Sequence, residues 1–437
     1  MWAIRNAGAL RGLTVRRELA NYPARNPPGE GVATRMPHVT TPLRVLLATT
    51  ATPDDRKTVC CARSLGRAGA WVAVGADRFW GQAYYSRHVR RRVRYPHPRL
   101  GVPAFVEALD RHVHATGCRA VLAMNDYTQL ALAAHRDALP AGVVTALPSF
   151  ETVDLACDKM RTLELARRLG IETPHTWAVH NEDDLHQAAD RVGYPCVMKL
   201  RRGAGAIGFR VLPDRDSLIA AYRQPRLPSD LVYDRDCLLV QEYIPGETRD
   251  ACVLLCHGEP RAGYTQRRVR TYPAEGGVGT LVETTDEPGL LARANRLMSA
   301  LNWHGPAQVE FRVDPRTGAA RLIEVNGRLW GTTAVAVRAG VDFPLLTCRL
   351  AVDGDVPPMR GYRVGLRYRF PFPFGLLALA EDGLRLSTTR DFFAPARGVC
   401  SDLSWRDPLP HLAEAGYIVR RAIARRSLRP QPATQRA

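Results

Sequence analysis

Short apolar runs separated by stretches of helical periodicity mark the start of ordered sequence at Leu43. Apolar runs of this length, bounded by polar residues, are typical of buried strands. Strands that alternate with helices predict a parallel sheet covered on both faces. The strands are expected at 44–50, 70–75 and 120–124, with helices at 58–68 and through Leu130 to Leu139. The turn after the first strand has no G-x-G-x-x-G, so a Rossmann-like fold is expected without a dinucleotide site.

A second unit begins near Phe150 and has a different pattern. It opens on a helix from Asp158 to Leu169, which Gly170 ends. Further strands and one helix then predict a small α+β lid at about 175–237. The lid elements are a helix at 182–192, a strand ending at Lys199, a strand at 208–212, and a strand from 238 that runs into a hinge near 247.

Two apolar-polar alternating segments, 308–314 and 320–328, flank a turn with Pro315 and Gly318. This pattern predicts a β-hairpin in which Glu310 lies about opposite Glu324. The strand period of two places Glu324, Asn326 and Arg328 on one face. Facing carboxylates repel each other, and such a pair persists most easily around a divalent cation. The alternative is an ordinary exposed strand face with mixed charges.

Lysine is rare in this chain, where 58 of the 61 basic residues are arginine. Lys199 ends an apolar run and directly precedes the glycine-rich stretch 203–208. A strand that delivers an ammonium beside a flexible glycine loop suits the binding of nucleotide phosphates. Lys159 starts the helix that precedes this strand and is a candidate for the same role, whereas nothing around Lys57 indicates a site.

These elements, in this order, resemble the ATP-grasp superfamily and in particular its carboxylate–amine ligases. The resemblance runs from about Asp158 to about Asp355. The fold class is accordingly expected to be α/β and α+β, multidomain, with a Rossmann-like N-terminal domain followed by an ATP-grasp domain. The expected parts are a disordered basic leader at 1–42, the Rossmann-like domain at 43–150, the ATP-grasp domain at 151–355, and a C-terminal extension with a basic tail at 356–437.

The resemblance implies a role for each matching position. The residues implied to contact ATP phosphates are Lys159, Lys199 and the loop glycines Gly203, Gly205 and Gly208. Those implied to bind adenine are Glu242, Tyr243 and Ile244, and Glu247 is implied to bind the ribose. Those implied to hold Mg²⁺, as two ions and with Mn²⁺ as a substitute, are Glu310, Glu324 and Asn326.

Two arginines are candidates for catalysis. The resemblance implies that Arg328 stabilises the transferred phosphoryl group and the acyl phosphate. Arg268 lies in the segment 266–270, where such ligases carry an arginine toward the acyl phosphate, and it is the residue chosen for this role; a solvated arginine cluster is the alternative interpretation. Asp126 follows a strand end and is expected to act as a helix N-cap. His304 is expected to be structural.

Composition narrows the function classes further. The net charge of +18 is concentrated at the ends, with six arginines and two glutamates in 1–35 and six arginines without an acid in 419–437. No nucleic-acid-binding motif accompanies this charge, so no specific nucleic-acid partner is expected. No apolar run reaches the ~18–20 residues of a membrane span. The ten cysteines form no CxxC pair, which predicts reduced thiols in the cytoplasm. The twelve histidines show no metal-ligand spacing.

The predicted activity is an ATP-dependent ligase that joins a small carboxylate to an amine through an acyl phosphate, releasing ADP and phosphate. Such chemistry needs orientation and charge neutralisation rather than a protein nucleophile. The family resemblance also suggests a homodimer. Two alternatives stay open: a non-catalytic ATP-binding regulatory module, and a carboxylase-like ATP-grasp enzyme that activates bicarbonate. Beyond Pro357, the prolines of 369–374 exclude an interior strand, and a helix is expected at about 411–426.

Overall fold

The computed structural model describes residues 43–51, 55–78, 81–203, 208–224, 238–393 and 398–416. The predicted leader, Gly205 and most of the basic tail lie outside these ranges. The predicted C-terminal helix is seen at 409–416, and the remainder of it lies outside the described residues. Within the described part of the chain, every helix is too short or too polar to cross a membrane.

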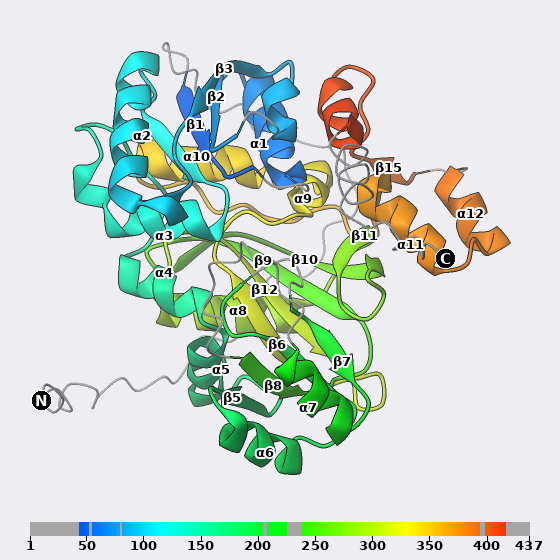
Figure 1. Ribbon diagram of the computed structural model, residues 1–437. Helices are drawn as coiled ribbons and strands as arrows, with labels where there is room; N and C mark the ends of the chain where they lie inside the picture. The colour runs from blue at the N-terminus through cyan, green and yellow to red at the C-terminus, as the bar shows by residue number, and fades with distance from the viewer. Residues whose placement is uncertain are drawn as a thin grey trace, which may run out of the picture. The chain divides into compact units, whose positions relative to one another are not determined.

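The N-terminal part is built on a parallel sheet of four strands in the order β3-β2-β1-β4 (Figure 1). The strands are β1 (Arg44–Ala48), β2 (Trp71–Ala76), β3 (Val89–Arg94) and β4 (Ala120–Ala123), and the helices are α1 (Arg56–Arg67), α2 (Val102–Thr116) and α3 (Asp126–Ala134). Helices connect the strands, which confirms the predicted Rossmann-like fold. The edge strand β3 is missing from the prediction because its sequence, VRRRVR, is largely polar and exposed.

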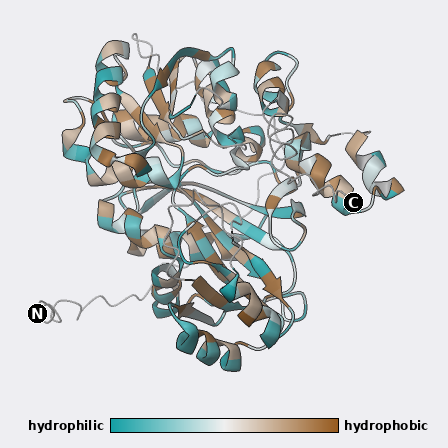
Figure 2. Ribbon diagram, viewed as in Figure 1, coloured by the Kyte–Doolittle hydropathy of each residue, from teal (hydrophilic) through white to brown (hydrophobic). Residues whose placement is uncertain are grey.

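The lid is an antiparallel sheet of four strands in the order β5-β8-β6-β7. Its elements are β5 (Thr176–Val179), α6 (Glu182–Arg191), β6 (Cys196–Leu200), β7 (Arg210–Leu212), α7 (Arg215–Arg223) and β8 (Leu238–Glu242). Apolar residues of both helices pack with the sheet in one core. Figure 2 shows the polar outer faces of α6 and α7 in teal, as expected for amphipathic helices with one buried face.

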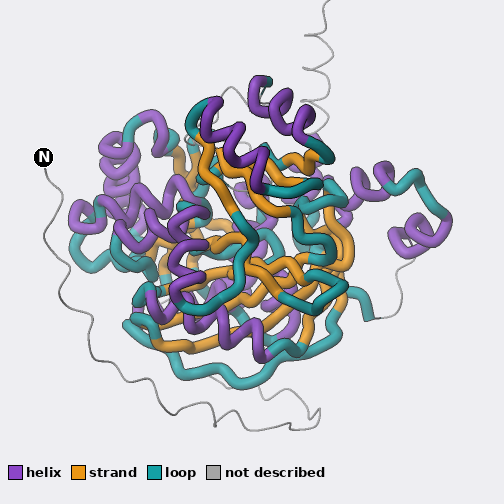
Figure 3. Tube along the Cα trace, turned by 90° about the horizontal axis from the view of Figure 1, so that it is seen from below, coloured by secondary structure: helices purple, strands orange, loops and turns teal. Residues whose placement is uncertain are grey.

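A seven-stranded sheet in the order β13-β12-β9-β10-β11-β14-β15 forms the largest layer. Its strands are β9 (Thr248–Cys256), β10 (Glu259–Tyr272), β11 (Val278–Thr285), β12 (Gly305–Val313), β13 (Ala320–Asn326), β14 (Arg367–Arg369) and β15 (Cys400–Ser401). Figure 3 shows the strands grouped together with helices around them. The short strands β14 and β15 thus belong to this sheet, although they come from the predicted extension.

Strand β9 is buried on both faces, and its side chains alternate between two cores. Ala251, Val253 and Leu255 belong to one core with α8. Cys252 and Leu254 belong to a second core on the other face. This is the period-two alternation of a strand that separates two apolar layers. Both faces are apolar, so the strand reads as a continuous apolar run.

The remaining helices cover these sheets. They are α4 (Phe150–Cys157), α5 (Lys159–Arg168), α8 (Pro288–Ala300), α9 (Thr333–Ala339), α10 (Phe343–Asp353), α11 (Leu376–Glu381) and α12 (Leu386–Phe393). Short 3-10 turns lie at Gln82–Tyr85, Pro98–Leu100 and Arg136–Ala138, so the helix expected through Leu130 to Leu139 ends at Ala134. The proline-rich run after β14 forms the helical turn Pro371–Gly375 rather than a strand, as its prolines predicted.

Candidate active site

The hairpin of β12 and β13 brings two carboxylates face to face. Glu310 pairs with Glu324, and Gln308 pairs with Asn326, in an antiparallel register. The prediction that Glu310 lies opposite Glu324 is therefore confirmed. A register shift between Glu310 and Phe311 increases the local twist of the pair, as bulges beside sites often do.

The Asn326 side chain lies between these carboxylates. Its Nδ2 donates to Glu310 Oε1 at 2.9 Å and contacts Glu324 Oε1 at 3.4 Å. A third oxygen, Gln308 Oε1, lies 3.4 Å from the same nitrogen. The sequence reasoning did not single out Gln308, although its place two residues before Glu310 on the same face was a usable signal.

Both candidate lysines reach this cluster. Lys159 Nζ lies 3.5 Å from Glu324 Oε2 and donates to Gly203 O at 2.7 Å. Lys199 Nζ lies 3.4 Å from Ile323 O, on the strand that carries Glu324. Each lysine is 8% exposed. The structure thus brings α5, β6 and β13 together at one point, as the predicted set requires.

The glycine loop between β6 and β7 is only partly described. Gly203 has a φ of 141° and Gly208 a φ of 73°, which are backbone conformations that glycine adopts most readily. Gly205 lies in the undescribed segment 204–207. Its role in phosphate binding stays a prediction.

Arg268 lies in the site rather than in a solvated cluster. Its guanidinium contacts Glu310 Oε1 at 2.6 Å and Asp250 Oδ1 at 3.0 Å. Asp250 is fully buried on β9 and accepts two hydrogen bonds from this arginine. Sequence reasoning missed Asp250. Its signal was an acid directly before the apolar run 251–256 of the same strand, because a buried charge requires a partner.

Arg328 joins the N-terminal domain to the hairpin. Its Nε donates to Asp126 Oδ1 at 2.5 Å, and its Nη2 donates to Asn326 Oδ1 at 3.1 Å. The expectation that Asp126 caps α3 was wrong. Asn125 caps the helix by accepting from the Thr128 backbone N–H, which leaves the Asp126 carboxylate to pair with Arg328.

The predicted adenine linker follows β8 and is held by main-chain and arginine contacts. The Glu242 N–H donates to His175 O at 2.9 Å, and the Glu242 carboxylate pairs with Arg321. Ile244 is buried and its carbonyl accepts from Arg312, whose guanidinium lies 5.8 Å from the centre of the Tyr243 ring.

The predicted ribose ligand, Glu247, pairs with Arg249 at 2.6 Å. The linker roles and this ribose role stay predictions.

Burial and neighbouring charge separate the ionisable groups of the cluster. Burial raises the pKa of Glu310 above its ordinary range, although Arg268 opposes this effect. Burial acts in the same direction on Glu324, but Lys159 and Lys199 lower its pKa below the ordinary value. Burial also lowers the pKa of Lys199 to about 8. The lysines therefore favour the charged form of Glu324, whereas burial favours the neutral form of Glu310.

The donor set fits a hard divalent cation. Glu310 and Glu324 supply carboxylate oxygens on facing strands, and Mg²⁺ takes oxygen ligands in octahedral geometry. Asn326 presents Nδ2 to these carboxylates and Oδ1 to Arg328. Rotating its amide exchanges the two ends, which would turn the oxygen toward a cation between the carboxylates.

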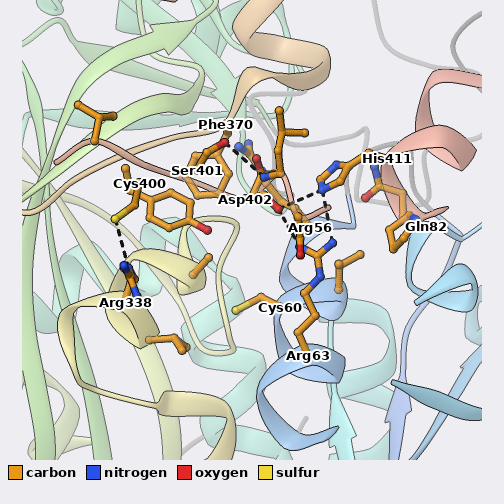
Figure 4. Close-up of a pocket in the computed structure, with 18 of the residues that line it drawn as sticks. Arg56, Cys60, Arg63, Gln82, Arg338, Phe370, Cys400, Ser401, Asp402 and His411 are labelled. Carbon is orange, nitrogen blue, oxygen red and sulfur yellow. Dashed lines mark hydrogen bonds between the residues drawn. The ribbon is translucent and has the colours of Figure 1, made fainter. Parts of the chain in front are cut away.

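A separate cavity of about 750 Å³ lies between α1, α9 and the C-terminal extension (Figure 4). Its wall includes Arg63, which donates to the Asp402 carbonyl at 2.7 Å and pairs with Asp407 at 2.8 Å. Arg338 on the opposite side donates to Cys400 Sγ at 3.2 Å. None of the predicted nucleotide residues lines this cavity. These contacts attach Asp402 and Asp407 to α1 of the N-terminal domain and Cys400 to α9.

Comparison with known proteins agrees with this geometry. Residues 158–357 match the family model described as the carbamoyl-phosphate synthase L chain, ATP binding domain. The chain is similar to the arginine-specific carbamoyl phosphate synthase large chain of Bacillus subtilis, at 26% identity over 243 residues, which are 52% of this chain and 22% of that protein. It is also similar to a putative urea carboxylase of Emericella nidulans, at 23% identity over 287 residues, 62% of this chain and 23% of that protein.

Two solved structures illustrate the shared fold. The biotin carboxylase domain of Hydrogenobacter thermophilus 2-oxoglutarate carboxylase aligns with a TM-score of 0.60 at 16% identity, over 74% of this chain and 73% of that one. The L-amino acid ligase of Bacillus licheniformis aligns with a TM-score of 0.53 at 18% identity, over 74% and 79%. At these identities the likeness concerns the fold.

The family-model match covers the same stretch that carries the lid, the lysines and the carboxylate hairpin. The chain spans less than a quarter of the length of these two curated relatives. The matched family model and the shared fold show that residues 158–357 form an ATP-grasp domain.

Proposed function

We propose that this protein is an ATP-dependent ligase that joins a carboxylate to an amine and uses Mg²⁺. The observation that carries the proposal is the meeting of Lys159 and Lys199 with the facing carboxylates Glu310 and Glu324 in one buried cluster. Ammonium groups can bind phosphate oxygens, and the carboxylates can bind the cation that accompanies a nucleoside triphosphate. The curated relatives include carbamoyl phosphate synthases, which supports ligase chemistry.

The proposed reaction has two steps. First, a carboxylate oxygen of the acid attacks the γ-phosphorus of ATP, the bond to the β-γ bridging oxygen breaks, and ADP leaves. Second, the amine attacks the acyl carbon, phosphate leaves, and the ammonium loses a proton as the amide forms. Both steps depend on positioning and charge neutralisation.

The chain's own residues supply these two effects. Lys159 and Lys199 hold the phosphate oxygens, and Arg268 and Arg328 face the transferred phosphoryl group and the acyl phosphate. Asp250 and Asp126 fix the orientation of these two arginines through direct ion pairs. Preorganised cations of this kind cost no rearrangement during the reaction.

The residues that would hold Mg²⁺ are Glu310, Glu324 and Asn326. The ion would supply Lewis-acid neutralisation of phosphate charge. The linker at Glu242, Tyr243 and Ile244 is proposed to take the adenine, and Glu247 the ribose. Arg249 must then share the Glu247 carboxylate with the ribose hydroxyls.

Bicarbonate is a second candidate for the activated acid. One solved structure of this fold is described in complex with MgADP and bicarbonate. Bicarbonate and an organic carboxylate present the same attacking oxygen to ATP, so the nucleotide cluster does not distinguish them. The assay below therefore tests both bicarbonate and organic carboxylates as the acid that ATP phosphorylates.

We further propose a cytoplasmic location, with the cysteines reduced. Nine cysteines are described and all are free thiols. A homodimer is proposed by analogy, because one structural neighbour is described as a domain dimer.

Phosphate release from Mg·ATP tests the proposal. The purified full chain is assayed with pooled amino acids, with other small carboxylates plus amines, and with bicarbonate. A pool that raises the rate, with loss of the increase in Glu324→Ala, supports a ligase. Tight ATP binding with no increase in phosphate release from any of these substrates favours a regulatory nucleotide-binding module. Absence of ATP binding overturns the proposal.

A further inference from the structure

Two histidines and a cysteine meet at the opposite end of strand β9 from Asp250. Cys256 and His257 form the end of β9 and the turn to β10, and His304 immediately precedes β12. Their donor atoms all lie within 4.8 Å of one another. The two imidazole rings stack with centroids 4.2 Å apart and planes at 21°.

His304 has an unmet hydrogen-bonding need. The residue is 8% exposed, and its Nδ1 is buried without a hydrogen-bond partner within the described residues. Buried polar atoms in folded proteins nearly always have a partner. The His304 ring lies beside a thiol and a second imidazole, so that a ring without all its hydrogen-bond partners stands among metal-binding groups.

The backbone holds the turn and the loop against each other. Gly258 N–H donates to Trp303 O at 2.8 Å, and Ser299 Oγ donates to Gly258 O at 2.5 Å. His257 adopts a left-handed conformation with a φ of 46°, as does Asn302 with a φ of 47°. Such conformations carry a cost for residues other than glycine and persist where surrounding contacts fix them.

We propose that Cys256, His257 and His304 bind a first-row transition metal, with Zn²⁺ as the preferred ion. Thiolate and imidazole donors select such metals over Mg²⁺. A tetrahedral zinc ion places its donors roughly 3.5 Å apart. The exposed His257 ring can therefore close the site by a rotation, while the buried Cys256 and His304 define its base.

Binding replaces a weak contact of the thiol. Cys256 Sγ now donates to Gly354 O at 3.5 Å. On binding, the S–H bond breaks, its proton leaves to solvent, and a bond from sulfur to the metal forms. Three protein ligands would leave a fourth position open to water. The neighbouring Asp355 contacts the Cys256 thiol and also pairs with Arg261 through contacts of 2.6 and 2.9 Å.

The site is separate from the proposed nucleotide site. Asp250 and Cys256 are six positions apart on β9, which is about 20 Å at strand spacing. The donor atoms differ as well. The candidate ligands are sulfur and nitrogen atoms at the Cys256 end of β9, and oxygen atoms at the Asp250 end. The expected role of the ion is to fasten the β9–β10 turn to the α8–β12 loop.

Cobalt titration of the full chain tests the inference. Protein freed of metal by a chelator is titrated with Co²⁺, which binds zinc sites and reports a cysteine ligand through thiolate charge-transfer absorption. We expect one equivalent that produces this band and that Zn²⁺ displaces. Cys256→Ser should abolish the band, and His257→Asn should weaken Co²⁺ affinity by at least about tenfold, or 1.4 kcal/mol.

Two features of the design keep the test decisive. Asn is the substitution of choice at His257 because it tolerates a positive φ, so this variant should fold. Cys400→Ser and His114→Asn are the matched controls, because they remove a half-buried cysteine and an exposed histidine elsewhere. The inference is overturned if no thiolate band forms, or if the band persists in both Cys256→Ser and His257→Asn. Co²⁺ at the oxygen cluster cannot mimic the result, since no sulfur lies among its ligands.

Discussion

The two ends of strands β9 and β12 present opposite donor chemistry on one rigid support. At one end Asp250 pairs with Glu310 across the strands, and Glu324 and Asn326 follow on the next strand. At the other end Cys256 and His257 meet His304. Oxygen donors favour Mg²⁺, whereas sulfur and imidazole favour Zn²⁺. A shared pair of strands can therefore keep two different ions apart without a separate domain for each.

The two ends also differ in how their charge is balanced. Arg268, Lys159 and Lys199 surround the carboxylates, so that end is a dense network of buried ion pairs. At the other end the neighbouring Asp355 and Arg261 pair with each other, and the candidate ligands are cysteine and histidine side chains rather than carboxylates. The first end is therefore expected to be sensitive to any change of charge, and the second to any change of ligand atom.

The largest effect is expected from Glu310→Gln, which preserves shape but removes one carboxylate. We expect substrate-stimulated phosphate release to fall by at least about 100-fold, the usual scale for losing a charge-stabilising group. The Co²⁺ thiolate band should be unchanged. In Cys256→Ser the pattern should reverse, with the band lost and phosphate release retained. Loss of both signals in either variant would contradict the independence of the two ends.

Arg328→Lys is expected to have the next largest effect. Lysine keeps the charge but cannot contact Asp126 and Asn326 together, as Arg328 does through Nε and Nη2. Loss of a charged hydrogen bond costs about 1.5–3 kcal/mol, or roughly 10- to 100-fold in kcat/KM for phosphate release. Arg349→Lys, which alters a pair with Asp353 on α10, is the control. Equal kinetics in the two variants would exclude Arg328 from the reaction.

Gly327→Ala tests a contact that lies between the two ends. A Cβ at this position would lie 2.4 Å from Cη2 of Trp303. Trp303 is the residue directly before His304. Overpacking of a buried contact typically costs about 1–3 kcal/mol in the free energy of unfolding. Urea unfolding measures the loss. Gly289→Ala is the control, because a Cβ there meets nothing within 4 Å. Equal stability of both variants would show that the Trp303 ring yields without cost.

The smallest effect concerns pH and Lys199. Its pKa of about 8 in the folded protein lies below the unfolded value of 10.5. The unfolded chain therefore binds more protons between pH 8 and 10.5, and this group's contribution to stability is lost as pH falls through that window. Bound phosphate favours the ammonium, so ATP binding should take up a proton above pH 8.

ATP affinity should accordingly weaken as pH rises above 8, by at most about tenfold per pH unit. Equilibrium binding of Mg·ATP between pH 7 and 9.5 measures this slope. In Lys199→Arg the side chain stays charged, so its affinity should change less over the same range. An identical slope in both proteins would assign the pH dependence to another group.

The sequence predicted the parts of the site that depend on local pattern. The register of Glu310 and Glu324 followed from strand periodicity and one turn, because a hairpin pairs residues close in sequence. The rarity of lysine identified Lys159 and Lys199 for a similar reason, since both stand next to recognisable elements. These local signals were enough to predict the lid and the carboxylate pair.

Other parts depend on contacts that are remote in sequence. His304 lies 47 residues after His257, and only the pairing of β12 with β9 brings them together. Asp250 was missed because its partner, Arg268, lies on the neighbouring strand β10 at the far end of a hairpin. Asp126 was assigned to the wrong role because its competitor for the cap, Asn125, is the adjacent residue.

The second core of the molecule has a consequence for how this protein can be divided. That core is continuous from Val45 and Leu47 on β1, through Leu350 on α10, to Leu254 on β9. Cutting the chain near residue 150 would expose apolar surface on both products, because each piece supplies half of one interior. The two domains are thus expected to be inherited and exchanged as a single unit, and neither half is expected to be soluble when expressed by itself.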